Sequence, residues 1–249
     1  MRKTILLLLL TLTCLASFSQ FSINYDFTRP LGEQGRNIST AHGISFAFEH
    51  RLKNSPLLVG AELGLNYYGL KTVEQELEFH NGYVTKTDVH YATSFTTYAI
   101  SLKLQPETKK HVKPYGIFRT GVLNYHSNMT IDDPDDPLGC KALEKKALVK
   151  DYTWMASAGG GINLDWQVLN PKSGSRLQID LGVFYTLGGN ADYLKMKKTS
   201  DDVDPKGKLY YVDFQHIPTG EVHDHAIGKV YNTMTSLLTI RAGIRFPID

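Results

Sequence analysis

Apolar and polar residues alternate with a period of two along most of this chain. The alternating segments are 21–32, 43–52, 57–69, 96–106, 112–125, 154–168, 177–189 and 235–249. A period of two is typical of half-buried β-strands, which turn successive side chains to opposite faces. In the last segment Ile240 and Ile244 lie on one face, while Arg241 and Arg245 lie on the other. Only around Arg119 is the alternation unclear, and there we expect a β-bulge.

The connections between these segments are alternately short and long. The short ones are 53–56, 107–111 and 170–175, an intermediate one is 32–40, and the long ones are 70–91, 129–151 and 190–233. Short turns at one end and long loops at the other are typical of outer-membrane barrels. The pattern therefore predicts an all-β fold. We expect one eight-stranded antiparallel up-and-down transmembrane β-barrel with short periplasmic turns and long extracellular loops.

The apolar face could point inwards, as in a soluble lipocalin-like barrel, or outwards, as in a membrane barrel. Small residues on the polar face favour the second alternative, because the interior of an eight-stranded barrel is only just wide enough to be filled by side chains. They include Gly43, Ser45, Gly64, Ser157 and Gly161. We therefore predict that the polar face lines the lumen and that the apolar face contacts lipid.

The polar faces also carry nearly balanced charge. The charged residues expected in the lumen are Glu49, Arg51, Glu62, Lys103, Arg119, Asp165, Asp180, Arg241 and Arg245. An arginine on the lipid face costs about 2–4 kcal/mol at the bilayer midplane, and an enclosed charge is tolerable only when it is paired. We interpret these residues as structural ion pairs. A proton or ion path is the alternative, which the narrow core of such a barrel disfavours.

Aromatic residues at the ends of the apolar faces predict the two girdles of a membrane barrel. The girdle candidates are Tyr67, Tyr98, Trp154, Trp166, Tyr185 and Phe246. Trp154 and Trp166 stand twelve residues apart in one predicted strand, which corresponds to about 40 Å of strand. With the tilt of such strands, this spans roughly 30 Å of height, close to the separation of the girdles.

The first residues predict a secretory signal. Arg2 and Lys3 precede an apolar run and a small-x-small cleavage site, so we expect a signal peptide over 1–19 and a single barrel domain over 20–249. Removing Arg2 and Lys3 from the 27 basic residues leaves 25, equal to the 25 acidic residues. This balance gives no indication of a nucleic-acid partner. Cys140 is then the only cysteine left, so no intramolecular disulfide is expected.

The long connections contain three predicted local structures. Asn81-Gly82 is a strong two-residue hairpin signal, so the third and fourth strands should continue as a ribbon whose edge could pair with a partner strand; a solvated ribbon without a partner is the alternative. Residues 210–226 predict a second hairpin. Residues 137–150, which include Cys140, predict a short amphipathic helix over the barrel mouth.

Candidate chemistry in these connections is weak. His216, His223 and His225 could approach one another in the last loop, but solvated histidines are the simpler interpretation, and we predict neither a metal site nor a cofactor. His126 and Ser127 are the candidates for a nucleophile–base pair. As neighbours in a strand they point to opposite faces and cannot bond to each other, so no enzyme is predicted.

The short turns, the long loops, the lumenal charges and the closing stretch Ala242–Phe246 resemble eight-stranded outer-membrane barrels of the OmpA/OmpX and PorT-like type. The resemblance covers nearly the whole mature chain, although Pro247, Ile248 and Asp249 follow the closing aromatic. It implies an integral protein of the bacterial outer membrane, surrounded by lipid, with both termini periplasmic. It also implies envelope anchoring, loop-mediated adhesion or assistance to a secretion apparatus.

We therefore expect a barrel with a filled lumen that presents hairpin loops to a protein partner or supports an envelope complex. A narrow porin for small solutes is one alternative, and a lipid-modifying outer-membrane enzyme is another. The identity of the partner and the oligomeric state stay open.

Overall fold

The computed structural model describes residues 19–53, 55–78, 84–108, 110–133, 142–171, 174–196, 207–216 and 221–248. The predicted signal peptide, Asn81-Gly82 and Cys140 lie outside these ranges. Their elements are β1 (Ser19–Pro30), α2 (Gln34–Asn37), β2 (Ala41–Arg51), β3 (Leu57–Glu78), β4 (Val84–Leu104), β5 (Val112–Asp132), β6 (Ala142–Asp165), the 3₁₀ turn η2 (Trp166–Val168), β7 (Gln178–Met196), β8 (Lys208–His216) and β9 (Glu221–Ile248).

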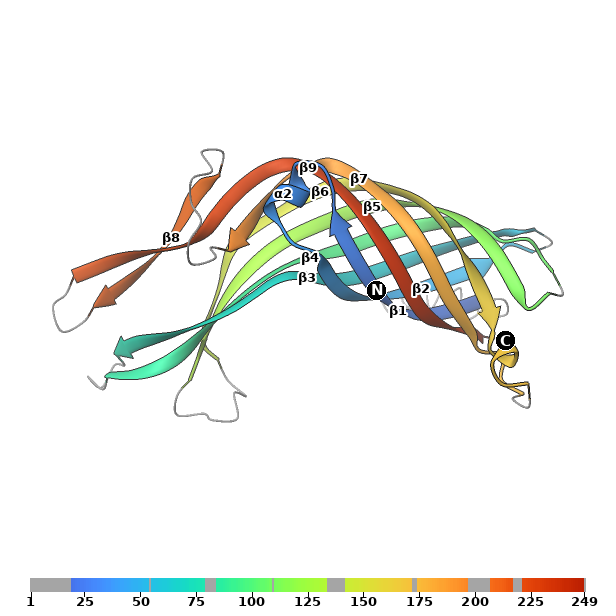
Figure 1. The fold of residues 1–249 in the computed structure, drawn as a ribbon, viewed down its shortest axis with the longest axis horizontal. Helices are drawn as coiled ribbons and strands as arrows, with labels where there is room; N and C mark the ends of the chain where they lie inside the picture. The colour runs from blue at the N-terminus through green and yellow to red at the C-terminus, as the bar shows by residue number, and fades with distance from the viewer. Residues whose placement is uncertain are drawn as a thin grey trace, which may run out of the picture.

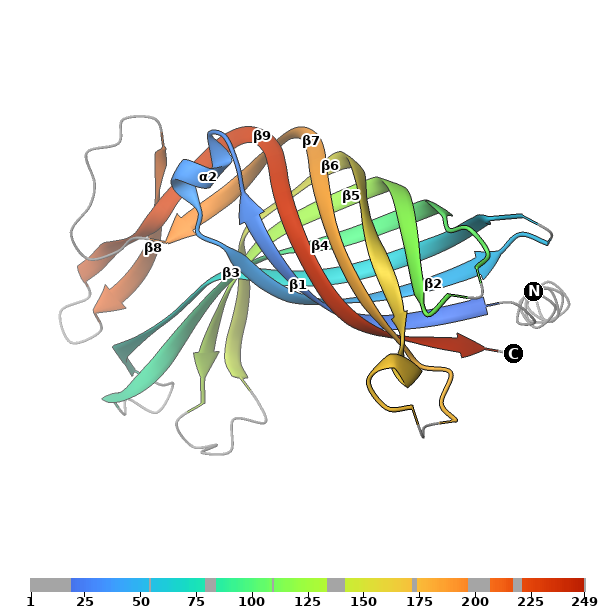
Figure 2. The ribbon, with the colours of Figure 1, turned by 45° about the vertical axis from the view of Figure 1, so that its right-hand side comes forward.

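Eight of these strands form a closed antiparallel barrel (Figures 1 and 2). Each strand pairs with the next along the chain, except that β7 pairs with β9, and β1 closes the barrel by pairing with β9. The predicted eight-stranded up-and-down architecture is confirmed. The ninth strand, β8, pairs with β9 outside the closed part, and together they form the hairpin predicted for residues 210–226.

The barrel carries its apolar residues on the outside. Ile44, Ile100 and Ile240 are each more than half exposed, whereas Arg241 and Arg245 are buried. A continuous apolar belt of this kind is unusual on a soluble monomer and is the surface of an integral membrane barrel. In the described residues, no helix is long and apolar enough to cross a membrane.

The prediction of a β-bulge near Arg119 is wrong. β5 pairs without interruption with β4 and β6 through this residue, and its irregularities lie further along, at Ser127/Asn128 and Ile131/Asp132. The alternation looked unclear because the inward face of β5 holds buried Leu123 and Tyr125 as well as Arg119. Here the interior is partly apolar, so the polar face expected from the sequence is interrupted.

The predicted helix over 137–150 is also wrong wherever the chain is described. β6 begins at Ala142 and pairs with β5, with Lys146 opposite Met129. Alanine, leucine, glutamate and lysine favour helices, but a strand lets Leu148 reach a buried apolar cluster. Packing across the sheet therefore overrides local propensity in this segment.

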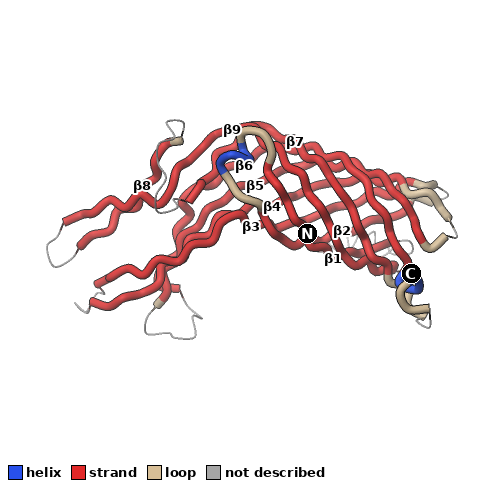
Figure 3. The backbone as a smooth tube through the Cα atoms, viewed as in Figure 1, coloured by secondary structure: helices blue, strands red, loops and turns tan. Residues whose placement is uncertain are grey.

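Six barrel strands continue beyond the point where β1 and β2 end. We call this part the extension; it comprises residues 70–78 of β3, 84–92 of β4, 127–132 of β5, 142–149 of β6, 190–196 of β7, β8, and 221–234 of β9. Figure 3 shows that strand continues far past the closed part. The ribbon expected from the third and fourth strands is confirmed, because β3 pairs with β4 as far as Glu78 opposite Val84. The continuation of β5, β6 and β7 as strands was not expected. The connections at the other end, which we call the short-turn end, are brief.

Candidate functional site

The centre of the lumen holds a neutral group of four charges around Arg241. Its Nε lies 2.7 Å from Asp26 Oδ1, and its Nη1 and Nη2 lie 2.8 Å from the two carboxylate oxygens of Glu62. Arg119 donates to the same Glu62 at 2.7 Å and to Ser157 Oγ at 3.0 Å. All four charged groups are buried, and each arginine is paired with a carboxylate, as an enclosed charge requires.

A second neutral group lies nearer the short-turn end. Arg245 contacts Glu49 at 2.8 Å and Asp180 at 3.3 Å, and Lys103 contacts Glu49 at 3.3 Å. The Tyr115 hydroxyl donates to Asp180 at 2.6 Å, and the Lys103 ammonium sits 3.8 Å from the centre of the Tyr115 ring. Two acids and two bases again balance.

Two of the predicted lumenal charges lie apart from these groups. Arg51 donates to the backbone oxygens of Ser55 and Gln105, and Asp165 pairs with Lys113 at 2.8 Å; both residues are at the short-turn end. The other seven predicted residues are brought together. Asp26 was not among the predicted lumenal charges, although its place between outward Tyr25 and Phe27 indicates that it points inwards.

Above the charges, aromatic rings cross the lumen. Neighbouring ring centres are 5.7–6.5 Å apart in the series Tyr68, Phe95, Tyr125, Tyr193 and Tyr231. All five side chains are buried and belong to one apolar cluster. The alternation of apolar and polar residues predicted small and charged residues in the lumen and gave no sign of this aromatic layer.

The short helix α2 covers the aromatic layer. Gln34 donates to the Tyr125 hydroxyl at 2.8 Å and accepts from the backbone N–H of Ser236 at 3.2 Å. Asn37 donates to the Tyr193 hydroxyl at 3.0 Å. A helix thus covers the barrel interior, as predicted, but it lies in the connection between β1 and β2 and not in residues 137–150.

The described part of the lumen contains a small void. A void of about 30 Å³ lies between the charged groups and the aromatic layer, bordered by Glu62, Phe95 and Arg241 among others. A void of this size is large enough to hold water.

The predicted girdle residues lie on the outer surface with one exception. Tyr67, Tyr98, Trp154, Tyr185 and Phe246 are exposed on strands. Trp166 is only half-buried and belongs to the 3₁₀ turn η2, because β6 ends at Asp165. The prediction that Trp154 and Trp166 lie in the same strand is therefore wrong.

Histidine chemistry is limited in the described part of the chain. His126 and Ser127 do face opposite sides, but His126 Nε2 lies 2.8 Å from Ser94 Oγ on the neighbouring strand. Ser94 is 1% exposed, and His126 Nδ1 is buried without a described partner. This arrangement lacks the accessible nucleophile and the orienting acid of a hydrolytic triad. The side chains of His216, His223 and His225 lie outside the described residues.

The extension has an apolar interior of its own. Val89, Met129, Leu148 and Leu194 come from four different strands and form a buried cluster, with Val212 of β8 packed into it. These side chains lie on the inward face of strands that continue past the closed barrel. The described parts of the long connections therefore share one apolar core.

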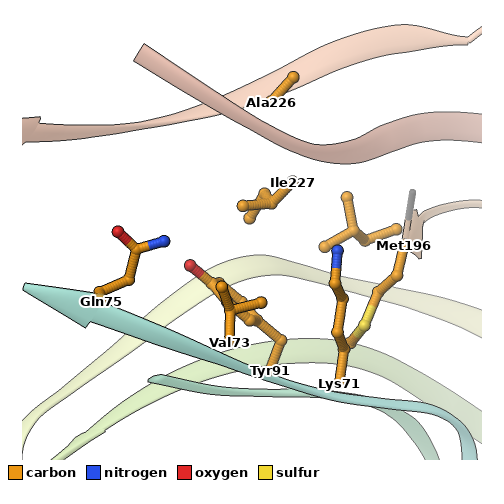
Figure 4. A pocket seen from close by; sticks show the side chains of 8 residues that line it. Lys71, Val73, Gln75, Tyr91, Met196, Ala226 and Ile227 are labelled. Atoms are coloured by element: carbon orange, nitrogen blue, oxygen red, sulfur yellow. The ribbon is translucent and has the colours of Figure 1, made fainter. Parts of the chain in front are cut away.

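A small pocket opens beside this core. It measures about 90 Å³ and is lined by Lys71, Val73, Gln75, Tyr91, Leu194, Met196, Ala226 and Ile227. Figure 4 shows the β3 side chains pointing across the pocket towards Ala226 and Ile227 of β9. Burial raises the pKa of Tyr91, so its hydroxyl stays protonated and neutral at physiological pH.

The pocket lies beside one edge of β3. β2 pairs with β3 only as far as His42 opposite Tyr67, and beyond that point β3 pairs with β4 alone among the described strands. Over residues 72–78, one row of backbone N–H and C=O groups therefore has no pairing among the described strands. Edges of this kind can pair with another chain.

No protein-family model matches the chain, and no curated protein matches it. Among solved structures, it is similar to a major outer membrane protein from Thermus thermophilus, with 12% identity over 92% of this chain and 98% of that one and a TM-score of 0.43. Neisserial surface protein A gives 11% identity, 92% and 96% coverage, and a TM-score of 0.39.

The outer membrane protease OmpT from Escherichia coli gives 9% identity, 93% and 97% coverage, and a TM-score of 0.38. Identities and scores this low carry no argument about what this chain binds or does. The barrel described above rests on the strand pairing and burial of this chain itself.

Proposed function

We propose that this chain is an integral protein of the bacterial outer membrane that binds a protein partner through the extension. In this proposal both termini are periplasmic and the extension stands outside the cell. The observation that carries it is the edge of β3 over residues 72–78, which pairs with β4 alone among the described strands and lies beside an apolar core. Such an edge can offer main-chain hydrogen bonds to a strand of another protein.

The filled lumen supports binding over solute transport. Two neutral groups of buried charges, an aromatic layer and α2 lie in series along the barrel axis. A narrow porin would need a continuous wet path through these layers. Liposome swelling with small sugars measures this directly, and the proposal expects no swelling above that of empty liposomes.

The same proposal gives the chain no catalytic role. The buried Ser94 and the unpartnered Nδ1 of His126 support this. A lipid-modifying enzyme would also need its nucleophile to be accessible to lipid.

Site-specific cross-linking on intact cells tests the proposed binding. A photoreactive residue at Thr72, on the edge of β3 over residues 72–78, should give one reproducible cross-linked protein. The matched control places the same residue at Ala147, which is exposed on the β6 part of the extension. Equal cross-linking from both positions, or none from Thr72, would contradict binding through the β3 edge.

A further inference from the structure

We propose that an apolar groove on the outer face of β2–β5 binds one acyl chain of an anionic phospholipid, whose phosphate is held by His50 and Lys53 at the short-turn end. This inference requires only that the closed barrel stands in a membrane. It is independent of the extension and of the protein partner proposed for it.

The groove lies within the apolar belt of the closed barrel. Its volume is about 630 Å³, and pockets that hold small ligands typically measure about 300–1,000 Å³. Four neighbouring strands contribute to its lining, which includes Phe48, Val59, Ala61, Ile100, Leu102 and Phe118. The lipid face is therefore hollowed here by enough to take a hydrocarbon chain.

The strand register explains why the surface is hollow at this place. One row of outward side chains across the four strands is His50, Val59, Leu102 and Phe118, and the next row is Phe48, Ala61, Ile100 and Thr120. Ala61 and Thr120 are small and stand among large side chains. The Thr120 hydroxyl donates to the backbone oxygen of Met155 at 3.0 Å, so this hydroxyl is satisfied within the sheet. The floor of the groove can therefore contact hydrocarbon.

The surroundings of the groove decide which part of a lipid enters it. Ile100 is 66% exposed and Phe118 is 50% exposed, and on a membrane barrel such an outward apolar band meets lipid. Because lipid tails are as apolar as the groove, no hydrophobic driving force holds one tail there, and only closer packing favours it. A lasting complex therefore needs a polar contact at one end of the tail.

His50 offers such a contact at the edge of the groove. It is half-buried, lines the groove and stands one residue before the end of β2. Lys53 follows in the turn and is exposed. Imidazole and ammonium groups donate hydrogen bonds to phosphate oxygens. A phospholipid with one tail in the groove would thus have its phosphate beside these two residues.

The turns at this end of the groove carry an excess of positive charge. In residues 51–56 and 105–113 the only acid is Glu107, whereas the lysines and arginines are Arg51, Lys53, Lys109, Lys110 and Lys113. Glu107 lies 3.8 Å from Arg51, and Lys113 pairs with Asp165 at 2.8 Å. Basic residues at a membrane surface attract anionic lipids. The excess of positive charge therefore favours an anionic headgroup over a zwitterionic one.

The same charges disfavour a second copy of this chain as the occupant of the groove. In a two-fold symmetric dimer, the same surface of both chains forms the interface. Two chains that cross one membrane in the same orientation would then bring their basic turns together at one level, and like charges repel. An anionic lipid brings the opposite charge to this place.

Native mass spectrometry of the full chain tests the inference. The protein is folded into vesicles that contain phosphatidylglycerol and phosphatidylethanolamine in equal amounts with identical acyl chains, and it is then released in a mild detergent. We expect one phospholipid to be retained on each barrel. Phosphatidylglycerol should be preferred about five-fold, as expected for one added cation beside an anionic headgroup.

Two variants with matched controls locate the two parts of the site. Ala61→Phe fills the floor of the groove and should lower retention of both lipids about five-fold, while Ala242→Phe, on the exposed outer face of β9, should not. Lys53→Gln should remove the preference for phosphatidylglycerol, while Lys150→Gln, an exposed lysine of β6 nearer the extension, should keep it. Variants are compared only if they keep the gel mobility shift of the folded barrel on boiling.

Three outcomes would overturn the inference. Equal retention of the two phospholipids removes the selection of an anionic headgroup, and equal retention by the Ala61→Phe and wild-type chains removes the groove as the site. A dimer of the wild-type chain that Ala61→Phe dissociates would assign the groove to a second copy instead. None of these results changes the cross-link from Thr72, which tests binding through the extension separately.

Discussion

Arg241 shows why charges inside this barrel come in neutral groups. Its guanidinium contacts Asp26 and Glu62, and Glu62 is shared with Arg119. Removing one partner of a buried pair leaves an uncompensated charge, which typically costs about 3–5 kcal/mol. As single residues, the arginines are structural elements that fill a narrow space and whose charges are already compensated.

Asp26→Asn should therefore lower the free energy of unfolding by about 3 kcal/mol. The amide keeps the shape of the side chain but removes the charge opposite Arg241. Urea unfolding in lipid vesicles, followed by tryptophan fluorescence, measures the change. Asp88→Asn is the control, because Asp88 is exposed and faces Glu74, so its removal should be neutral or slightly stabilising. Equal stability of the Asp26→Asn and wild-type proteins would show that the ion pair between Asp26 and Arg241 does not contribute to stability.

Ser94 gives a second prediction for a single residue. Ser94→Ala removes one hydrogen bond to His126 and should cost about 1 kcal/mol of stability. It should leave the membrane lipids of the cell unchanged by mass spectrometry, since Ser94 is buried. A lipid species that disappears with this substitution would establish the enzyme alternative instead.

Among the elements, α2 and the aromatic layer are two separate barriers in one lumen. α2 is held by hydrogen bonds from Gln34 and Asn37 to tyrosines of the layer beneath it. The rings below it pack against one another, and Ile38 at the end of the helix belongs to the same buried cluster. The charged groups lie deeper still, so side chains fill the lumen at more than one level.

Replacing residues 31–39 with a short glycine–serine turn should therefore leave the barrel non-conducting. The aromatic layer and the ion pairs remain after the helix is lost. Planar-bilayer recordings of the variant and the wild type should both show only baseline current. Stepwise channel openings in the variant alone would mean that α2 is the gate of a pore, and the narrow-porin alternative would then replace the proposed function.

Across the molecule as a whole, the apolar belt separates the closed barrel from the extension. Ile100 lies on the belt and is 66% exposed, while Leu70 lies on the extension and is 74% exposed. Exposure alone does not distinguish the two residues. The solvent does, since lipid surrounds the belt and water surrounds the extension.

Ile100→Arg should destabilise the protein by about 2–4 kcal/mol in vesicles, as arginine does on the lipid face of a barrel near the bilayer midplane. Leu70→Arg should change stability by less than about 0.5 kcal/mol, as surface substitutions usually do. Both variants are compared with the wild type by urea unfolding in the same vesicles. Similar small effects at both positions would contradict the embedding of the belt in lipid.

Local pattern was enough to place the strands of the closed barrel and the side that most of their residues face. Strict alternation makes a one-residue slip impossible without turning Arg241 to lipid and Ile240 inwards, so the facing of each side chain follows from its own strand. Alternation also separated short turns from long connections. These features are local, because the alternation of apolar and polar residues is visible in the sequence of each strand alone.

Which residues meet inside the barrel depended on the closed fold. The partners of Arg241, the ring contacts from Tyr68 to Tyr231 and the pocket beside Val73 join residues that are far apart in sequence. Local pattern failed where packing opposed propensity, as in the strand that begins at Ala142, and where apolar residues such as Leu123 fill the interior. The physical reason is that the register between strands in the closed barrel decides which inward side chains lie at the same height along its axis. The alternation within one strand does not specify that register.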